Sequence, residues 1–256
     1  MRRTRPRIHA RLGRALLVLA LAAAGAGAIA VPQAAHAEAA PADPIDTAMR
    51  ECLARADRSS TAGQVQCTDA ARAAWRSASD AAYQSLEANA PEKVRRGWQE
   101  SQRRWLAWRN QEVVLVRAVI ATTRGSVYEM AGANLLLQPE RDRALALRRV
   151  AASFDAQGQQ SSSQPAADSN DNPMPRLRAC SLDAACEHAQ FDVNRYRRKL
   201  RDKLPSHVRT TLARAQRAWL AYYEATAPLG SEADRADLIG ARVATMKRLS
   251  ETAGND

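Results

Sequence analysis

The stretch Gln-Arg-Arg-Trp-Leu-Ala-Trp at residues 102–108 returns as Gln-Arg-Ala-Trp-Leu-Ala-Tyr at residues 216–222. Both copies lie in segments rich in Ala, Arg, Leu, Gln and Glu, which are good helix formers, and β-branched runs are short throughout the chain. Around the first copy, large apolar residues recur on one side of a helix: Trp98, Trp105, Val113, Val116 and Ile120. The sequence therefore predicts an all-α fold.

Two more landmarks accompany each copy in the same order. Cys67 precedes Tyr83 by 16 residues, and Cys180 precedes Tyr196 by the same 16. A weaker match completes each set of landmarks: residues 143–149 and 242–248. Three landmarks in one order are hard to obtain by chance from helical composition, so we predict that one Cys-containing helical unit occurs twice.

Proline, glycine and asparagine interrupt the helical pattern and predict where helices end. We expect helices at these approximate positions: 45–58, 65–88, 91–122, 139–153, 183–202, 206–226 and 232–252. Residues 155–175 are rich in Gln, Ser, Asn and Pro and have almost nothing to bury, which predicts a flexible linker. We therefore expect two small antiparallel helical-bundle units, at 45–154 and 176–253, joined by this linker and stapled by disulfides.

The first 37 residues have the three-part pattern of a secretory signal peptide. Several arginines and no acidic residue precede Ala15, an apolar run follows to Val31, and small residues flank His36. We expect cleavage before Glu38 and a mature protein in the periplasm or outside the cell. A membrane anchor is the alternative, but the Ala- and Gly-rich run is at the short limit for crossing a bilayer, so no stable membrane insertion is expected after cleavage.

The charge of the mature chain is modest. From Glu38 onward, 32 basic and 27 acidic residues give a net charge of +5, compared with +11 for the whole chain. Acidic residues are interleaved with basic ones, and the arginines between residues 91 and 122 are scattered around the helix. Because no basic face is concentrated there, we expect no nucleic-acid partner.

An even number of cysteines in an exported chain favours disulfides over a metal site. The four cysteines, Cys52, Cys67, Cys180 and Cys186, allow three connectivities. The local pairing fits best, because each pair then lies within one unit. It requires Cys180 to lie before its helix begins, since six residues of helical rise would hold Cys180 and Cys186 about 9 Å apart.

The order of these landmarks resembles the LprI-type lysozyme inhibitor family, small helical domains of exported bacterial proteins. The family signature of Gln, then Trp-Leu, then Arg is matched by Gln102, Trp105, Leu106 and Arg109, and an earlier cysteine precedes Cys67 as in the family. The resemblance covers two segments: about 48–150 and, in shorter form, about 178–252. It implies tandem copies of the N-terminal LprI-like domain.

The chain departs from the family pattern in places that affect inherited function more than fold. Trp75-Arg76 and His188-Ala189 stand where the family often has Leu-Asp, and Tyr223 replaces the signature arginine in the second unit. The further cysteine pair that often follows the Trp helix is missing.

The Gln-x-x-Trp pairs favour packing over an interface. Trp105 shares the apolar stripe of its helix, and Gln102 is placed to form a hydrogen bond across one helical turn. The expected structural motif is therefore Tyr83, Gln102, Trp105, Tyr196, Gln216 and Trp219.

Trp108 and Tyr222 lie about 60° beyond that stripe. Because Trp and Arg are enriched at interface hot spots, we expect Trp108, Arg109 and Tyr222 to form a partly exposed contact surface.

No pattern in the sequence predicts catalysis. The mature chain has only two histidines, His188 and His207, and neither forms a convincing pair with a cysteine nucleophile or a zinc-ligand pattern. Phosphate-binding loops and hydrolase motifs are missing as well. We expect no enzyme activity, no metal and no cofactor.

Two functions remain open. The resemblance implies an exported binding protein that inhibits a lysozyme or related cell-wall hydrolase by protein–protein contact. The alternative is a non-enzymatic envelope adaptor or structural module that binds another protein or peptidoglycan. Many lysozymes are cationic, and a partner at +5 lacks charge complementarity unless local carboxylates such as Glu232, Asp234 and Asp237 compensate.

Overall fold

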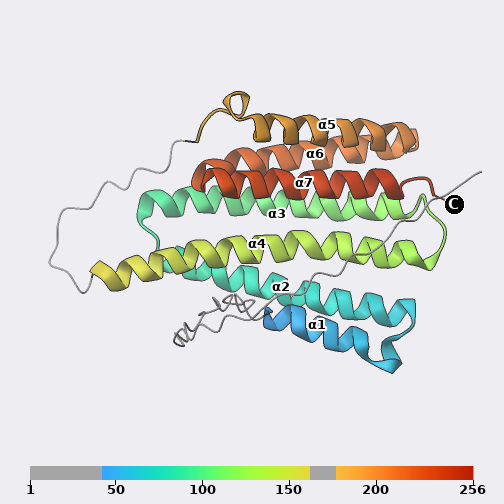
Figure 1. The fold of residues 1–256 in the computed structure, drawn as a ribbon, viewed down its shortest axis with the longest axis horizontal. Coiled ribbons are helices and arrows are strands. Elements are labelled where there is room, and N and C mark those ends of the chain that lie inside the picture. Colours follow the sequence, from blue (N-terminus) through green and yellow to red (C-terminus); the bar gives the residue numbers. More distant parts are fainter. Residues whose placement is uncertain (1–41, 162–176, 256) are drawn as a thin grey trace, which may run out of the picture. The chain divides into compact units, whose positions relative to one another are not determined.

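The computed structural model describes residues 42–161 and 177–255. Within these residues the chain is helical and has no strand, which confirms the all-α prediction. Figure 1 shows the helices, whose bounds are α1 Pro44–Ala54, α2 Thr61–Asn89, α3 Glu92–Ile120, α4 Ser126–Ser161, α5 Ala184–Lys203, α6 Ser206–Thr226 and α7 Glu232–Thr252. Most helices begin within a few residues of the position that the sequence predicts.

Polar side chains cap several of these helices. Asp43 accepts a hydrogen bond from the Ile45 amide at the start of α1, and the Ser60 hydroxyl accepts one from Gly63 at the start of α2. Ser231 and Asp234 form a reciprocal capping box that begins α7. These caps satisfy amide groups that have no partner within the helix, so they fix where each helix starts.

The α4 helix corrects the sequence prediction at both ends. It begins at Ser126 rather than near residue 139, and Pro139 lies inside it. Proline cannot donate the backbone hydrogen bond and usually breaks a helix. Packing overrides that preference here, because α4 runs along α2 and buries Leu135, Leu137 and Leu147 on either side of Pro139.

At its other end, α4 continues to Ser161, past the point where the linker was expected to begin. A hydrogen bond of 2.7 Å from the Asn89 side chain to the Asp155 carboxylate ties this extension to the end of α2. Adding residues to an existing helix costs little compared with starting one, so a polar sequence continues the helix once a contact holds it. The remaining linker residues, 162–176, lie outside the described residues.

The helices of the two sequence halves pack together. α2 packs along α4, α3 along α6 and α5 along α7, so that α3 and α6 join the halves (Figure 1). One core cluster includes Leu115 and Val119 from α3, Leu200 from α5, Leu212 from α6 and Met246 from α7. The described residues, 42–161 and 177–255, form one compact unit, and the expected arrangement of two separate bundles is therefore not confirmed.

Both disulfides have the local pairing that the sequence favours. Cys52 bonds to Cys67 and Cys180 to Cys186. Cys180 begins a short 3₁₀ turn that ends before α5 begins, as this pairing requires. The first disulfide joins α1 to α2, and the second fastens the turn before α5 onto that helix.

The expected signal peptide, residues 1–37, lies outside the described residues. Among the residues that are described, no helix combines the length and apolar character needed to cross a membrane.

Candidate functional site

Two buried arginines occupy matching positions in the two halves. Arg143 of α4 donates from Nη2 to the side-chain oxygen of Gln102 at 2.7 Å, and Arg242 of α7 donates from Nη2 to Gln216 at 3.0 Å. In each case Nε donates to the same oxygen, at 3.2 Å and 3.3 Å. The two glutamines therefore bind arginines from a neighbouring helix, rather than forming the hydrogen bonds across one helical turn that we expected.

The aromatic residues of the two heptapeptides meet between these arginines. Trp108 and Tyr222 stack with ring centroids 5.2 Å apart and an interplanar angle of 6°. The Arg143 guanidinium carbon lies 5.6 Å from the Tyr222 ring, and that of Arg242 lies 5.9 Å from the Trp108 ring. Each arginine therefore contacts an aromatic ring of the other half, a distance at which cation–π attraction is favourable.

This arrangement corrects the expectation of an exposed contact at Trp108 and Tyr222. Only 7% of Trp108 and 4% of Tyr222 is exposed. Trp108 on α3 points toward α6, and Tyr222 on α6 points toward α3. The two rings therefore bury each other, although both lie about 60° from the apolar stripe of their helix. Trp105 and Trp219 also lie in the core.

Arg109 does not join Trp108 and Tyr222. Its guanidinium lies 5.0 Å from the Trp105 ring centroid and 4.0 Å from the Glu140 carboxylate, in a second cavity of about 210 Å³.

The two landmark tyrosines, Tyr83 and Tyr196, are half-buried, and the Tyr83 hydroxyl donates to the Glu87 carboxylate at 2.7 Å. Burial, followed by this hydrogen bond, raises the pKa of Tyr83 to about 12.

The two arginines differ in their counter-ions. Arg242 forms an ion pair with Glu112 at 2.8 Å, and both side chains are almost fully buried. Among the described residues, Arg143 has no carboxylate within ion-pair distance, and its Nη1 donates to the Ser101 hydroxyl at 3.2 Å. Burial lowers the pKa of the Arg143 guanidinium.

The spacing of residues after the two glutamines accounts for this difference. Glu112 follows Gln102 by ten residues, and Thr226 follows Gln216 by the same ten. Thr226 thus stands at the position that matches Glu112, and its hydroxyl lies 2.7 Å from that of Ser101. A neutral hydroxyl pair stands beside Arg143 where the other half places a carboxylate.

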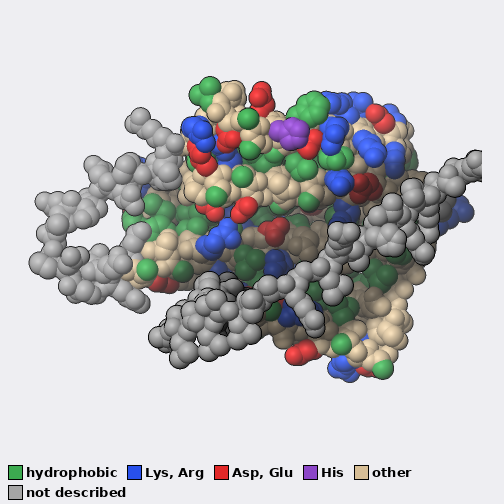
Figure 2. Space-filling view, viewed as in Figure 1, with side chains coloured by type: hydrophobic (Ala, Val, Ile, Leu, Met, Phe, Trp, Pro, Cys, Tyr) green, Lys and Arg blue, Asp and Glu red, His purple; other side chains and the backbone are tan. Residues whose placement is uncertain are grey.

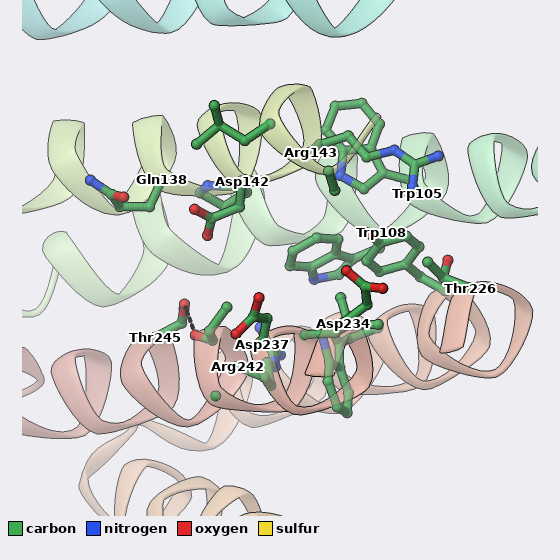
Figure 3. A pocket seen from close by; sticks show the side chains of 18 of the residues that line it. Trp105, Trp108, Gln138, Asp142, Arg143, Thr226, Asp234, Asp237, Arg242 and Thr245 are labelled. Atoms are coloured by element: carbon green, nitrogen blue, oxygen red, sulfur yellow. Dashed lines mark hydrogen bonds between the residues drawn. The ribbon is translucent and has the colours of Figure 1, made fainter. Parts of the chain in front are cut away.

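A groove of about 730 Å³ lies between α4 and α7, next to the buried arginines and aromatic rings described above (Figure 3). Its floor is aromatic and consists of Trp98, Trp105, Trp108, Trp219 and Tyr222. Concave, mostly apolar sites with a few polar groups are typical of binding surfaces. We refer to it as the α4–α7 groove.

Carboxylates from both walls point into this groove. In Figure 3, Asp142 projects from α4, while Asp234 and Asp237 project from α7 toward it. The Asp234 carboxylate already has partners within the protein: it contacts Arg149 at 3.3 Å and forms the capping box of α7 with Ser231. Among the described residues, Asp142 and Asp237 have no hydrogen-bond or ion-pair partner.

The pKa of Asp142 is raised. Burial within the groove walls is the main cause, Arg141 opposes it, and the negative charge of Asp237 adds to the increase. A carboxylate that faces a second carboxylate in a partly desolvated groove is ionised less readily. A cation placed between the two would remove this cost.

The sequence contained a weak signal for part of this site. The third and weakest repeat match, residues 143–149 and 242–248, begins in both halves with the arginine that binds the glutamine. The sequence suggested Asp237 only as one of three local carboxylates, and nothing in the local pattern singled out Glu112 or Asp142. Solvated helix faces carry many such carboxylates, and only the packing of α3, α4 and α7 separates these three from the rest.

The described residues contain no cluster of three or more His, Cys, Asp or Glu side chains that could hold a metal ion. All four cysteines are in disulfides. The groove offers an apolar floor and unpaired charges, which is an arrangement suited to binding.

Comparison with known proteins gives similarities of two kinds. Residues 47–147 match the model of the family described as lysozyme inhibitor LprI. The crystal structure of an uncharacterised protein from Burkholderia thailandensis has 56% sequence identity and a TM-score of 0.76, covering 84% of this chain and 100% of that chain. The comparison with curated proteins found no match. The LprI segment includes Asp142 and Arg143 of the α4 wall and three of the five floor residues of the groove, Trp98, Trp105 and Trp108.

Proposed function

This chain belongs to the same family as the Burkholderia thailandensis protein, and because its residues 47–147 match the lysozyme inhibitor LprI family, we propose that it inhibits a lysozyme or related cell-wall hydrolase. It acts as an exported binding protein through protein–protein contact and without catalysis of its own. The match at residues 47–147 is the observation that carries this proposal. The two disulfides agree with an oxidising compartment outside the cytoplasm.

The α4–α7 groove is the contact surface in this proposal. A basic side chain of the hydrolase enters it, its charge lies between Asp142 and Asp237, and its apolar stem packs on Trp108. A guanidinium or ammonium group is favoured there by the two unpaired carboxylates and by the aromatic floor. Arg149 and Arg248 lie at the groove as well, and Arg149 already contacts Asp234.

This placement bears on the objection raised by the net charge of +5 through two unpaired carboxylates, in a groove whose lining holds three aspartates and four arginines. Complementarity depends on the local surface that meets the partner and not on the total charge. Of the carboxylates suggested by sequence, Asp234 and Asp237 line the groove. Glu232 lies outside its lining and forms an ion pair with Arg178 at 2.7 Å.

A turbidity assay tests the proposed function. The chain from Glu38 onward is added to cell-wall suspensions together with each of several lysozymes and related hydrolases, and the rate of clearing is measured. We expect at least one hydrolase to slow at micromolar concentrations of this protein. If none slows, a pull-down from envelope extract shows whether the alternative, an adaptor for another protein or for peptidoglycan, takes its place.

Neutralising the groove carboxylates tests the contact surface. The double variant Asp142→Asn/Asp237→Asn is expected to bind the inhibited hydrolase about tenfold or more weakly, because charged hydrogen bonds contribute about 1.5–3 kcal/mol each. Inhibition constants are measured beside the control Glu51→Gln/Asp80→Asn, which removes two exposed carboxylates on α1 and α2. Equal inhibition by wild type and groove variant would place the contact on another surface.

The raised pKa of Asp142 predicts a pH dependence. A partner cation requires the ionised carboxylate, so affinity is greatest above the pKa of Asp142 and falls as pH decreases through it. Because that pKa lies above the ordinary value of about 3.9, the loss begins at higher pH than for an ordinary aspartate. Calorimetric titration from about pH 7 to pH 4 measures it, and the single variant Asp142→Asn should lose this component.

A further inference from the structure

Basic residues are concentrated in one segment of the second half. Residues 195–217 contain nine basic residues and one acidic residue, Asp202, for a net charge of +8. The chain from Glu38 to its end has a net charge of +5, so the remainder of that chain has a net charge of −3. The expectation that basic charge is spread along the chain is therefore wrong for this segment, although it holds for residues 91–122.

These residues are exposed or half-exposed on two helices that are consecutive in the chain. They occupy the C-terminal half of α5, from Arg195 to Lys203, and the first two-thirds of α6, from Arg209 to Arg217. Figure 2 shows Lys and Arg side chains crowded over the right-hand half of α5. We call this surface the basic patch; its members are Arg195, Arg197, Arg198, Lys199, Arg201, Lys203, Arg209, Arg214 and Arg217.

Most of the basic patch is free of counter-ions. Arg195 pairs with Asp192 at 3.2 Å and Arg201 with Asp202 at 2.9 Å. Arg209 donates to the Leu204 carbonyl. The other members have no hydrogen-bond or ion-pair partner among the described residues and leave their charge uncompensated: Arg197, Arg198, Lys199, Lys203, Arg214 and Arg217.

The patch is held on a fixed framework. On its other side α5 buries Val193 and Leu200, and Leu204 and Val208 anchor the turn into the core. The cations therefore project from an amphipathic helix that is already folded and packed. Binding an extended anionic surface would order few additional groups, which lowers the entropic cost of association.

We propose that the basic patch binds the surface of a bilayer that contains anionic phospholipids. Clusters of four to eight Lys and Arg residues on an amphipathic helix attract anionic headgroups, and each contributes about 1 kcal/mol near the surface. An array of phosphates in one plane meets the exposed cations of α5 that lie away from its buried residues Val193 and Leu200, among them Arg195, Arg198 and Lys199. The chain is held there peripherally, in agreement with the finding that no described helix could span a membrane.

A nucleic acid fits the patch less well. Neither the α4–α7 groove nor the second cavity is lined by a patch residue, so neither provides a channel for a strand there. Single-stranded nucleic acids are usually held by aromatic side chains on which bases stack. Within residues 195–217 the only aromatic side chain apart from His207 is the half-buried Tyr196, and the Arg195 guanidinium already lies 4.6 Å from its ring.

The patch and the groove are separate surfaces, because no residue of the patch lines the groove. The protein can therefore bind a membrane surface while the groove stays open to a partner. This inference does not depend on the proposed inhibition, and vesicle binding can succeed or fail independently of the turbidity assay.

Co-sedimentation with vesicles tests the proposal. The chain from Glu38 onward, which contains the whole compact unit, is mixed with vesicles of phosphatidylglycerol and phosphatidylcholine or with vesicles of phosphatidylcholine alone. We expect binding to the anionic vesicles only, and we expect it to weaken steeply with salt because exposed charges are screened. Equal binding to neutral vesicles, or tighter binding to DNA than to anionic vesicles at the same salt concentration, would overturn the proposal.

A pair of matched variants locates the binding surface. The patch variant is Arg197→Gln/Arg198→Gln/Lys199→Gln/Lys203→Gln, and the control is Lys93→Gln/Arg96→Gln/Arg103→Gln/Arg104→Gln on α3. Both remove four exposed or half-exposed cations from helices. We expect the patch variant to bind anionic vesicles at least about a hundredfold more weakly, and the control to lose much less. Equal losses would show a response to net charge alone, and thermal unfolding monitors whether each variant is folded.

Discussion

Glu112→Gln is expected to lower the free energy of unfolding by about 3–5 kcal/mol, the cost typical of removing one partner from a buried ion pair. The Arg242 side chain is completely buried and that of Glu112 is 2% exposed, so water cannot replace the lost carboxylate. The same carboxylate accepts a hydrogen bond from the Trp108 indole at 3.0 Å, and this bond is altered as well. Urea unfolding monitored by circular dichroism measures the change.

A substitution in the other half of the molecule is expected to raise the free energy of unfolding. Thr226→Glu places a carboxylate at the position that matches Glu112, next to the unpaired Arg143, and the groove provides room for the longer side chain. We expect a gain of about 1 kcal/mol, since a charged hydrogen bond contributes about 1.5–3 kcal/mol and the Ser101–Thr226 bond is lost. An exposed control, Glu92→Gln, should change stability by about 0.5 kcal/mol at most.

Together, these two variants test whether a carboxylate beside each buried arginine, Arg242 or Arg143, stabilises the fold. A loss below about 1 kcal/mol in Glu112→Gln would show that the aromatic rings and Gln216 are sufficient to stabilise the Arg242 charge. A loss of stability in Thr226→Glu would show that Arg143 and its neutral neighbours are already satisfied, and that the difference between the halves has no energetic consequence.

Removal of the Cys52–Cys67 disulfide is expected to have the next largest effect. The variant Cys52→Ser/Cys67→Ser opens a loop with a sequence separation of 15, which should cost about 3 kcal/mol in the chain-entropy model. The smaller loop closed by Cys180–Cys186, with a separation of 6, should contribute about 2 kcal/mol. Chemical unfolding of both double variants gives the two values.

Reduced wild-type protein is the control for these variants. Under reducing conditions its stability should fall to that of a variant that lacks both disulfides. The entropic explanation would be contradicted if the six-residue loop contributed more than the fifteen-residue loop, because closure entropy increases with loop length.

The sequence predicts helix positions well where capping and punctuation agree with packing. The α6 and α7 helices begin at the expected residues because Pro205 and Ser231, their N-cap residues, define the helix starts locally. It fails at α4, where Pro139 locally signals a break but long-range packing against α2 keeps the helix continuous. Local signals and tertiary packing compete at such positions, and a single sequence shows only the first.

The residues of the site also divide into those that the sequence predicted correctly and those whose surroundings depend on tertiary packing. Gln102, Trp105, Gln216 and Trp219 were predicted as structural residues from the repeat alone, and all four are buried. Trp108 was expected to be partly exposed because its direction on α3 leaves the apolar stripe. A helical projection shows direction but not the neighbour in that direction, and here the neighbour is Tyr222 of α6.

By itself, the sequence determined that the chain is helical and that two segments share the order of Cys, Tyr and Gln-x-x-Trp, and it favoured local pairing of the cysteines. These features depend on spacing along the chain, which is visible without a structure. Only the tertiary structure decided that the halves share one core, that Arg143 lacks the carboxylate that Arg242 has, and that Asp142 faces Asp237 across a groove. These relations join residues far apart in sequence, and they arise from helix packing that local propensities do not specify.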